Sequence, residues 1–284
     1  MTGQRVSVLA DNENFSRVGI WFNDPSNWWG SEGLIARARE HLIYTGIAVF
    51  IALLIALPLG LLIGHTGRGV GVVVGLANGL RAVPTLGFVV FLLVEVTPRI
   101  HFTQAFGFIP RGGVPYIIPV EFVLIVLAIP PILTNTYAGV QNVDPAARDA
   151  AKGMGMRGGQ VVRKVELPCA MPLIMSGLRS ATLQVIATAT VAAYAPFLGG
   201  LGRPIVDGVG QINDPQHGYT AMVCAGITVA VLAVVMDLLL LGVQQLVVSR
   251  GISGRFAPLP ERAVPGLGAD PAAVGSRSTA VAAS

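Results

Sequence analysis

The sequence predicts an all-helical protein that crosses a membrane several times. Hydrophobic residues make up 53% of the 284-residue chain and charged residues only 12%, whereas an ordinary soluble domain carries about 25% charged residues. The mean hydropathy is +0.68, and the apolar residues gather into segments that reach the roughly 20 residues needed for one helical crossing. These observations exclude an ordinary soluble domain.

Five apolar segments are predicted to span the membrane. They run from His41 to about Ile63, Val70 to Val96, Tyr116 to Val140, Met171 to Phe197 and Tyr219 to Val248. Arg81 and Pro84 interrupt the second segment, which predicts a kinked or two-part helix. The stretch 97–116 is rich in Pro, Gly and Arg and is predicted to form a loop.

The chain divides by composition into three regions. Residues 1–40 are polar and irregular, with a cluster of aromatic rings just before the first span, where such rings favour the membrane–water interface. They lack the pattern of a cleavable signal peptide, so the first span is expected to direct insertion itself. Residues 41–250 hold the spans. Residues 251–284 are poor in large apolar groups and are predicted to form a disordered tail.

The Lys and Arg residues predict the orientation in the membrane, because basic residues accumulate in short cytoplasmic loops. Nine lie beside span ends on one side, namely Arg68, Arg148, Lys152, Arg157, Arg163, Lys164, Arg250, Arg255 and Arg262. Five lie on the other side, namely Arg37, Arg39, Arg99, Arg111 and Arg203. The N-terminus is therefore predicted outside and the C-terminus in the cytoplasm. The net charge of +4 comes from these loops, which argues against nucleic acid as a partner.

No pattern in the sequence predicts catalysis, a metal site or a nucleotide site. Cys169 and Cys224 lack the spacing of a zinc site or a disulfide framework. The run 199–202 is Gly-rich but lacks the Lys-Ser/Thr of a phosphate-binding loop. Ser176 has no nucleophile motif around it. We therefore expect no catalytic residue, metal or cofactor on this chain.

The polar loop between the third and fourth spans, residues 142–170, has the features of a segment that binds a partner protein. Asp144 and Pro145 are typical of a helix start, because the carboxylate accepts free amide hydrogens and the proline lacks an N–H that would be unpaired there. Several alanines then favour a short, slender helix. Arg148 and Lys152 lie on one side of it at i, i+4 spacing.

Gly153 and Gly155 are predicted to end this helix. A second helix is predicted from about Arg157 to Val165, and Pro168 is predicted to stop it before the fourth span. The two helices are expected to form an L-shaped pair across the membrane surface. The alternative is a mere connecting loop, with alanines for helix propensity and basic residues for topology.

The same loop resembles the signature of the membrane subunits of binding-protein-dependent ABC importers. That signature reads Glu-Ala-Ala, three residues, Gly, nine residues, Ile, one residue and Leu-Pro. The matching residues are Asp149, Ala150, Ala151, Gly155, Val165, Leu167 and Pro168, with every spacing kept. Asp replaces Glu and Val replaces Ile.

Further segments indicate one branch of that family. They are Ala77–Asn78, Val83–Leu86, Asn135–Val140, Val143–Pro145, Gly153–Met156, Val165–Pro168 and Gly199–Arg203. They resemble the branch that imports glycine betaine, choline, carnitine or proline betaine, and the resemblance covers about residues 40–250. Tyr194–Leu198 and a long 97–115 segment depart from that branch.

The resemblance implies a fold, a role and a set of partners. The fold is that of a type I ABC importer permease, similar to methionine importers, with five spans and a cytoplasmic coupling loop at 142–170. The partners are two ATPase subunits that bind ATP and Mg²⁺ and grip this loop, an extracytoplasmic substrate-binding protein, and a second permease subunit, identical or related. The location is the cell membrane of a prokaryote.

The sequence leaves three alternatives to an importer of quaternary amines. The same machine could carry another small solute, such as an amino acid or a sulfonate. An ion-coupled secondary transporter would show inverted repeats and ion ligands near the midplane, and neither is evident. A membrane scaffold has no evident need for a slender, Gly-hinged cytoplasmic helix pair.

Two charged residues in the spans are predicted to pair. Arg179 and Asp237 lie roughly 8 and 11 residues from the cytoplasmic ends of their spans, hence at comparable depth at 1.5 Å per residue. A structural pair is favoured over a role in the pathway, because a single charge in lipid is costly. Glu95 and Glu121 fall near outer span ends and are expected to reach the interface.

Aromatic residues are the candidates for contact with the solute. A quaternary ammonium has no N–H to donate and is held best by aromatic faces. Tyr137, Tyr194 and Phe197 are the candidates for lining a low-affinity passage. The alternative for each is packing against lipid or another helix.

Overall fold

Four long helices and one broken helix form the apolar part of the chain. The computed structural model describes residues 16–100, 114–195, 198–212, 214 and 218–248. The long helices are α2 (Leu34–Thr66), α5 (Val114–Gln141), α8 (Leu167–Ala189) and α10 (Thr220–Val247), and the broken one consists of α3 (Val70–Ala82) and α4 (Thr85–Val96). Each long helix, with α8 extended back to Gly158, has the length and apolar composition to cross a membrane. The described residues contain no β-strand.

Short helical elements connect these helices. They are η1 (Pro25–Asn27), η2 (Thr97–Arg99), α6 (Pro145–Gly153), α7 (Gly158–Val161), the π-helical turn η3 (Val162–Glu166), η4 (Val191–Tyr194) and α9 (Arg203–Gly210). Residues 16–23 are also helical. The predicted tail, residues 251–284, lies outside the described residues.

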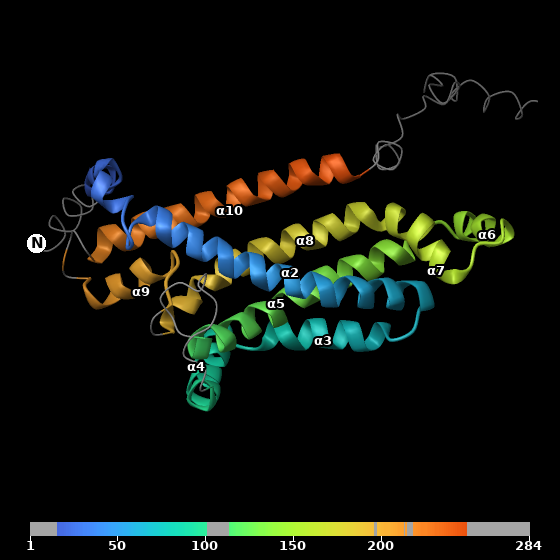
Figure 1. The fold of residues 1–284 in the computed structure, drawn as a ribbon, viewed down its shortest axis with the longest axis horizontal. Coiled ribbons are helices and arrows are strands. Elements are labelled where there is room, and N and C mark those ends of the chain that lie inside the picture. Colours follow the sequence, from blue (N-terminus) through green and yellow to red (C-terminus); the bar gives the residue numbers. More distant parts are fainter. Residues whose placement is uncertain (1–15, 101–113, 196–197, 213, 215–217, 249–284) are drawn as a thin grey trace, which may run out of the picture. The chain divides into compact units, whose positions relative to one another are not determined.

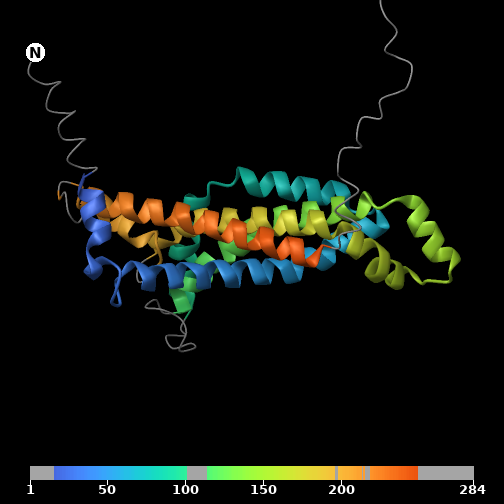
Figure 2. The ribbon, with the colours of Figure 1, turned by 90° about the horizontal axis from the view of Figure 1, so that it is seen from above.

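The order of the helices agrees with five passages. In Figures 1 and 2, α2 and α5 both run toward the end that carries α6, so the chain must return between them through α3 and α4. The break falls at Val83 and Pro84, because a residue before proline is held extended, and Val83 has φ −73° and ψ 125°. The prediction of a two-part second span is confirmed.

A stripe of small residues lets α2 lie directly against α5. The buried residues Ala48, Ala52, Ala56, Gly60 and Gly64 recur every fourth position along α2. A Cβ atom on Gly60 would lie 2.6 Å from Cβ of Thr136, and one on Gly64 would lie 2.6 Å from Cβ of Val140. Small residues at fourth positions are the pattern that allows backbones to approach in membrane helix pairs. Sequence analysis did not single out this stripe.

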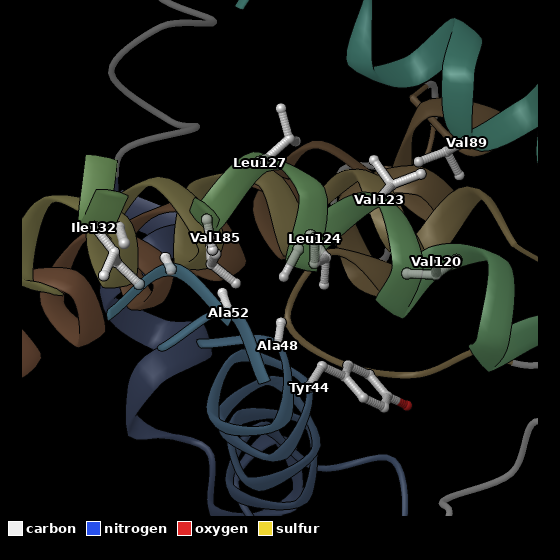
Figure 3. Close-up of a cluster of buried hydrophobic side chains, with 14 of the residues drawn as sticks. Tyr44, Ala48, Ala52, Val89, Val120, Val123, Leu124, Leu127, Ile132 and Val185 are labelled. Atoms are coloured by element: carbon white, nitrogen blue, oxygen red, sulfur yellow. The ribbon is translucent and has the colours of Figure 1, made fainter. Parts of the chain in front are cut away.

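The core surrounds α5, the most buried of the long helices. Figure 3 shows Val123, Leu124 and Ile132 of α5 among side chains of α2, α4 and α8. Helix α10 is the opposite case, since most of its surface is exposed and apolar, including Leu238 and Leu246. Such a surface is suited to a bilayer rather than to water.

Several predicted boundaries are wrong. Helix α2 begins at Leu34 rather than His41, directly after the extended Gly33, and residues 16–23 are helical rather than irregular. The fourth span ends at Ala189 rather than Phe197. Gly202 lies so close to the backbone of Thr190 that a Cβ atom there would overlap the Thr190 carbonyl. The chain therefore folds back onto the end of α8 instead of extending the helix.

Gly177 provides a test of this helix packing. An added Cβ atom would lie 2.7 Å from Cβ of Asn135 on α5, whereas Gly226 on α10 has nothing within 4 Å. We expect Gly177→Ala to lower the free energy of unfolding by about 1–3 kcal/mol through overpacking. We expect Gly226→Ala to leave it unchanged or raised, because Ala favours helix. Thermal unfolding of the purified protein in detergent measures both, and equal melting temperatures would contradict the packing.

Candidate partner-binding loop

The loop begins with helix α6, which starts where the sequence predicted. Asp144 Oδ1 accepts a hydrogen bond of 2.9 Å from the Ala146 amide, and Pro145 takes the first helical position. Ala151 is buried, whereas Ala146, Asp149, Ala150 and Gly153 are exposed. These four follow i, i+3, i+4, i+7 spacing and so share one face. Three of the four are Ala or Gly, so a partner can approach the backbone of α6 on this face.

Gly155 makes the turn that ends α6. The amides of Gly155 and Met156 donate to the carbonyls of Lys152 and Ala151 at 2.9 and 3.1 Å, which is the Schellman arrangement of a helix C-terminus. Gly155 has φ +82°, a conformation that a residue with a Cβ atom rarely adopts. The predicted break thus falls at Gly155, where glycine forms the turn without strain.

Pro168 does not stop the second helix, contrary to the sequence prediction. Helices α7 and α8 and the π turn between them form one continuous helical path from Gly158 to Ala189. In the π turn the Leu167 amide bonds to the Val162 carbonyl, five residues earlier. This wider turn moves the carbonyls out of α-helical register, so the proline ring and its missing N–H are accommodated.

A buried carboxylate joins the loop to the rest of the bundle. Glu166, at the end of the π turn, is only 1% exposed. Its Oε2 atom lies 2.9 Å from Nδ1 of His65, in the last turn of α2. Because a carboxylate only accepts, Nδ1 carries the proton in this bond. Its Oε1 atom lies 2.9 Å from Nε of Arg148 in α6, an ion pair in which the N–H does not point along a hydrogen bond.

Arg148 also holds the end of α5. Its Nη2 atom donates to the carbonyl of Val140, one of the last carbonyls of that helix. A basic group at a helix C-terminus is favourable, because it satisfies an unpaired carbonyl and the helix dipole. The sequence placed Arg148 and Lys152 together on one outer face, but only Lys152 points outward. Arg148 is turned inward by Glu166, whose role the sequence analysis missed.

The remaining signature residues lie at the base of the loop. Val165 and Leu167 are half-buried and Pro168 is exposed. Leu167 packs beside a small cluster formed by Val140 and two residues of α8. Within the second half of the signature, Leu167 thus packs the base of the loop against the bundle, whereas one face of α6 stays exposed.

A family model for the inner membrane component of binding-protein-dependent transport systems matches residues 40–248. This range includes the spans and the whole loop. The chain belongs to this family. It is therefore a multi-pass membrane permease subunit that works with an ATPase and a binding protein.

Permeases of known systems are similar to this subunit over most of their length. The glycine betaine/carnitine/choline transport system permease protein OpuCB of Bacillus subtilis (strain 168) is 31% identical, over 78% of this chain and 91% of that protein. The choline transport system permease protein OpuBB of the same strain is 32% identical, over 73% and 85%. The carnitine transport permease protein OpuCD of Listeria monocytogenes serotype 1/2a (strain 10403S) is 33% identical, over 71% and 80%.

Solved structures confirm the fold expected for the permease. An inward-facing structure of the MetNI methionine ABC transporter matches with a TM-score of 0.60 and 21% identity, covering 76% of this chain and 96% of that one. A crystal structure of an amino acid ABC transporter with histidines matches with a TM-score of 0.51 and 20% identity, covering 75% and 91%.

The candidate aromatic residues of the pathway do not form one group. Tyr137 is partly buried against the core. Tyr194 is 51% exposed in η4, and Phe197 lies outside the described residues. The structure does not test their part in a passage, which stays a prediction.

A polar group at the opposite end of the permease from α6 was missed by the sequence analysis. Glu40 is buried and accepts a 2.9 Å hydrogen bond from the amide of Gly200. His41 is fully buried, and its Nε2 atom lies 2.9 Å from the carbonyl of Ile186. The Glu40 bond holds the buried turn 198–202 against α2, and the His41 bond joins α2 to α8. The Gly-rich sequence of that turn was the available signal, since a Cβ atom on Gly199 would overlap Glu40.

The two acidic residues expected to reach the interface differ in exposure. Glu95 is exposed and lies 3.1 Å from Arg99, four residues along. Glu121 is buried instead, and neither carboxylate oxygen has a hydrogen-bond partner in the described part of the chain. Helix α5 is central, so a position near its end is still covered by neighbouring helices.

The structure brings Arg179 of α8 and Asp237 of α10 together. Nε and Nη2 of the arginine donate to the two carboxylate oxygens at 2.9 and 2.8 Å. This paired geometry is the strongest that an arginine and a carboxylate form. It fastens α10, which otherwise buries little of its surface, to the bundle.

We expect Arg179→Ala to destabilise the permease more than the double variant Arg179→Ala/Asp237→Ala. The single change leaves the Asp237 carboxylate half-buried and unpaired, whereas the double change removes both charges. A coupling of about 0.5–3 kcal/mol is typical of residues in contact. Melting of the single and double variants in detergent measures it. Additive losses would show that the pair contributes nothing.

Proposed function

We propose that this chain is the permease subunit of an ATP-driven importer of quaternary-amine osmoprotectants, namely glycine betaine, choline, carnitine or proline betaine. The observation that supports this solute class is the 31–33% identity to permeases whose names specify these compounds. High-affinity recognition resides on the substrate-binding protein, and this chain provides half of the passage.

The coupling loop 142–170 is the segment that the ATPase grips. Its exposed face carries Ala146, Asp149, Ala150 and Gly153, so a groove on the ATPase can reach the backbone of α6. Closure of two ATPase subunits on ATP would draw two such loops together. Because the loop is fixed to the bundle, the spans would rock between inward-open and outward-open states.

The remaining assignments follow from the separate roles of the permease and the ATPase. ATP and Mg²⁺ bind to the ATPase subunits, which carry out hydrolysis, and the permease has no catalytic residue. Two permease subunits, identical or related, meet in the complex. The excess of basic residues beside α6 supports a cytoplasmic loop and C-terminus and an external N-terminus.

A related solute is the alternative within the same architecture. The fold neighbours include a methionine transporter and an amino acid transporter, so an amino acid or a sulfonate would be carried by the same helices. An ion-coupled transporter is a weaker alternative, since the chain belongs to the family of binding-protein-dependent transport systems.

Uptake of labelled solute tests the proposed class. The chain would be expressed with its own ATPase and binding protein in a host that lacks betaine transport. We expect saturable, energy-dependent uptake of labelled glycine betaine that excess choline or carnitine reduces and methionine does not. Uptake of methionine in place of glycine betaine would assign the amino acid alternative.

The turn at Gly155 tests the coupling loop. Proline requires φ near −65° and is incompatible with the +82° of Gly155, so Gly155→Pro distorts the end of α6. We expect uptake to fall by about tenfold or more, since backbone strain of this kind costs about 1–3 kcal/mol. Membrane insertion should be unchanged.

Gly159→Pro is the matched control for this variant. Gly159 lies in the first turn of α7, where proline is tolerated, and has no atom within 4 Å of an added Cβ. Uptake should stay near that of the unchanged protein. Normal uptake by the Gly155→Pro variant would reject the role of the loop.

A further inference from the structure

Four helices meet at one buried point beside the coupling loop. Glu166 at the start of α8 contacts His65 at the end of α2 and Arg148 in α6, each at 2.9 Å. Arg148 in turn holds the carbonyl of Val140 at the end of α5. Gly64, next to His65, lies against Val140. Of these helices, α6 carries the exposed face that is proposed above to meet the ATPase.

Two short segments of backbone link α6 to its neighbours. Toward α7 the chain passes through Gly153 and Gly155, and toward α5 it passes through the short segment 142–144. Glycine gives the backbone more conformational freedom than any other residue. Side-chain contacts therefore add to what these backbone links, hydrogen-bonded at Asn142, Val143 and Gly155, can pass on.

The contacts of Glu166 are of the kind that resists separation. The carboxylate is 1% exposed, and a buried charge that loses its partner bears an uncompensated cost of leaving water. Arg148 and His65 are 22% and 28% exposed, so both are drawn inward toward the carboxylate. Movement of α6 must then either carry α2 and α8 with it or leave Glu166 unpaired.

We propose that Glu166 is the joint through which α6 moves α2. It acts as a positioning residue: Arg148 connects it to α6 and to the end of α5, and His65 connects it to the end of α2. The proposal rests on the coupling role of the loop proposed above. It adds that the bond between His65 and Glu166 joins the loop directly to α2, beside the packing of α2 against α5.

The bond between His65 and Glu166 can be removed and restored at one position. The amide nitrogen of asparagine occupies the place of Nδ1 of histidine and donates as it does. His65→Asn therefore keeps the bond, whereas His65→Leu removes it with an apolar side chain of similar bulk. His65 is 28% exposed, so both variants are expected to fold and to assemble with the ATPase.

Hydrogen exchange at the end of the permease opposite α6 measures whether movement of α6 reaches that end. The measurement needs no solute. The buried turn 198–202 is held by the bond between Glu40 and the Gly200 amide, and its opening would expose these amides. The full complex is compared with and without MgATP and vanadate, which traps the closed ATPase. We expect exchange of this turn to rise in the unchanged complex and with His65→Asn, but not with His65→Leu.

Transport provides the second readout. In proteoliposomes we expect His65→Leu to lower the solute imported per ATP hydrolysed by about tenfold, with His65→Asn close to the unchanged protein. Glu95→Gln, the same kind of polar change at an exposed site, should alter neither readout. Glu166→Gln should act like His65→Leu, because it removes the charge that holds Arg148.

The outcomes separate the joint from the proposed function. Equal exchange and equal coupling in the Asn and Leu variants would overturn the joint and leave the solute assignment standing. Lack of glycine betaine uptake, with the exchange response still present and lost in His65→Leu, would support the joint and reject the solute. Equal loss in both His65 variants would also overturn the joint, since the restored bond should rescue it.

Discussion

The close approach of α2 and α5 is the contact on which the rest of the structure depends. It is possible because one face of α2 carries only Ala and Gly at every fourth position, from Ala48 to Gly64. In a membrane the helices gain little from excluding water, so their association relies on close packing. With α2 and α5 in backbone contact, α8 and the broken pair α3 and α4 can surround α5. The core shown in Figure 3 is the result.

The same contact brings the functional loop to a defined place. Gly64 is the last member of the stripe, and His65 follows it directly. The ends of α2 and α5 therefore lie together where α6 leaves the bundle, and the carboxylate of Glu166 is buried between them. These contacts fix the loop to the bundle, and the outer face of α6 is its exposed part.

The two ends of the permease use polar residues in a similar manner. At the end with α6, Glu166 joins two helices and the loop. At the other end, Glu40 and His41 of α2 hold the buried turn 198–202 and the end of α8. Between them, Arg179 and Asp237 fasten α10. Separating a buried polar group from its partner costs free energy, so each of these contacts fixes one element relative to another.

The sequence by itself determined the class, the five passages, the two-part second span, the family and the start and break of α6. These features depend on local properties: apolar length, the missing N–H of proline, the positive φ of Gly155 and fixed motif spacing. Only the tertiary structure decided that Pro168 lies within a continuous helix, that Glu121 is buried, and that Arg148 turns inward to Glu166 rather than outward beside Lys152. Those outcomes depend on which side chains from distant segments meet, and no local pattern encodes the partner of a buried charge 101 residues away, as for His65 and Glu166.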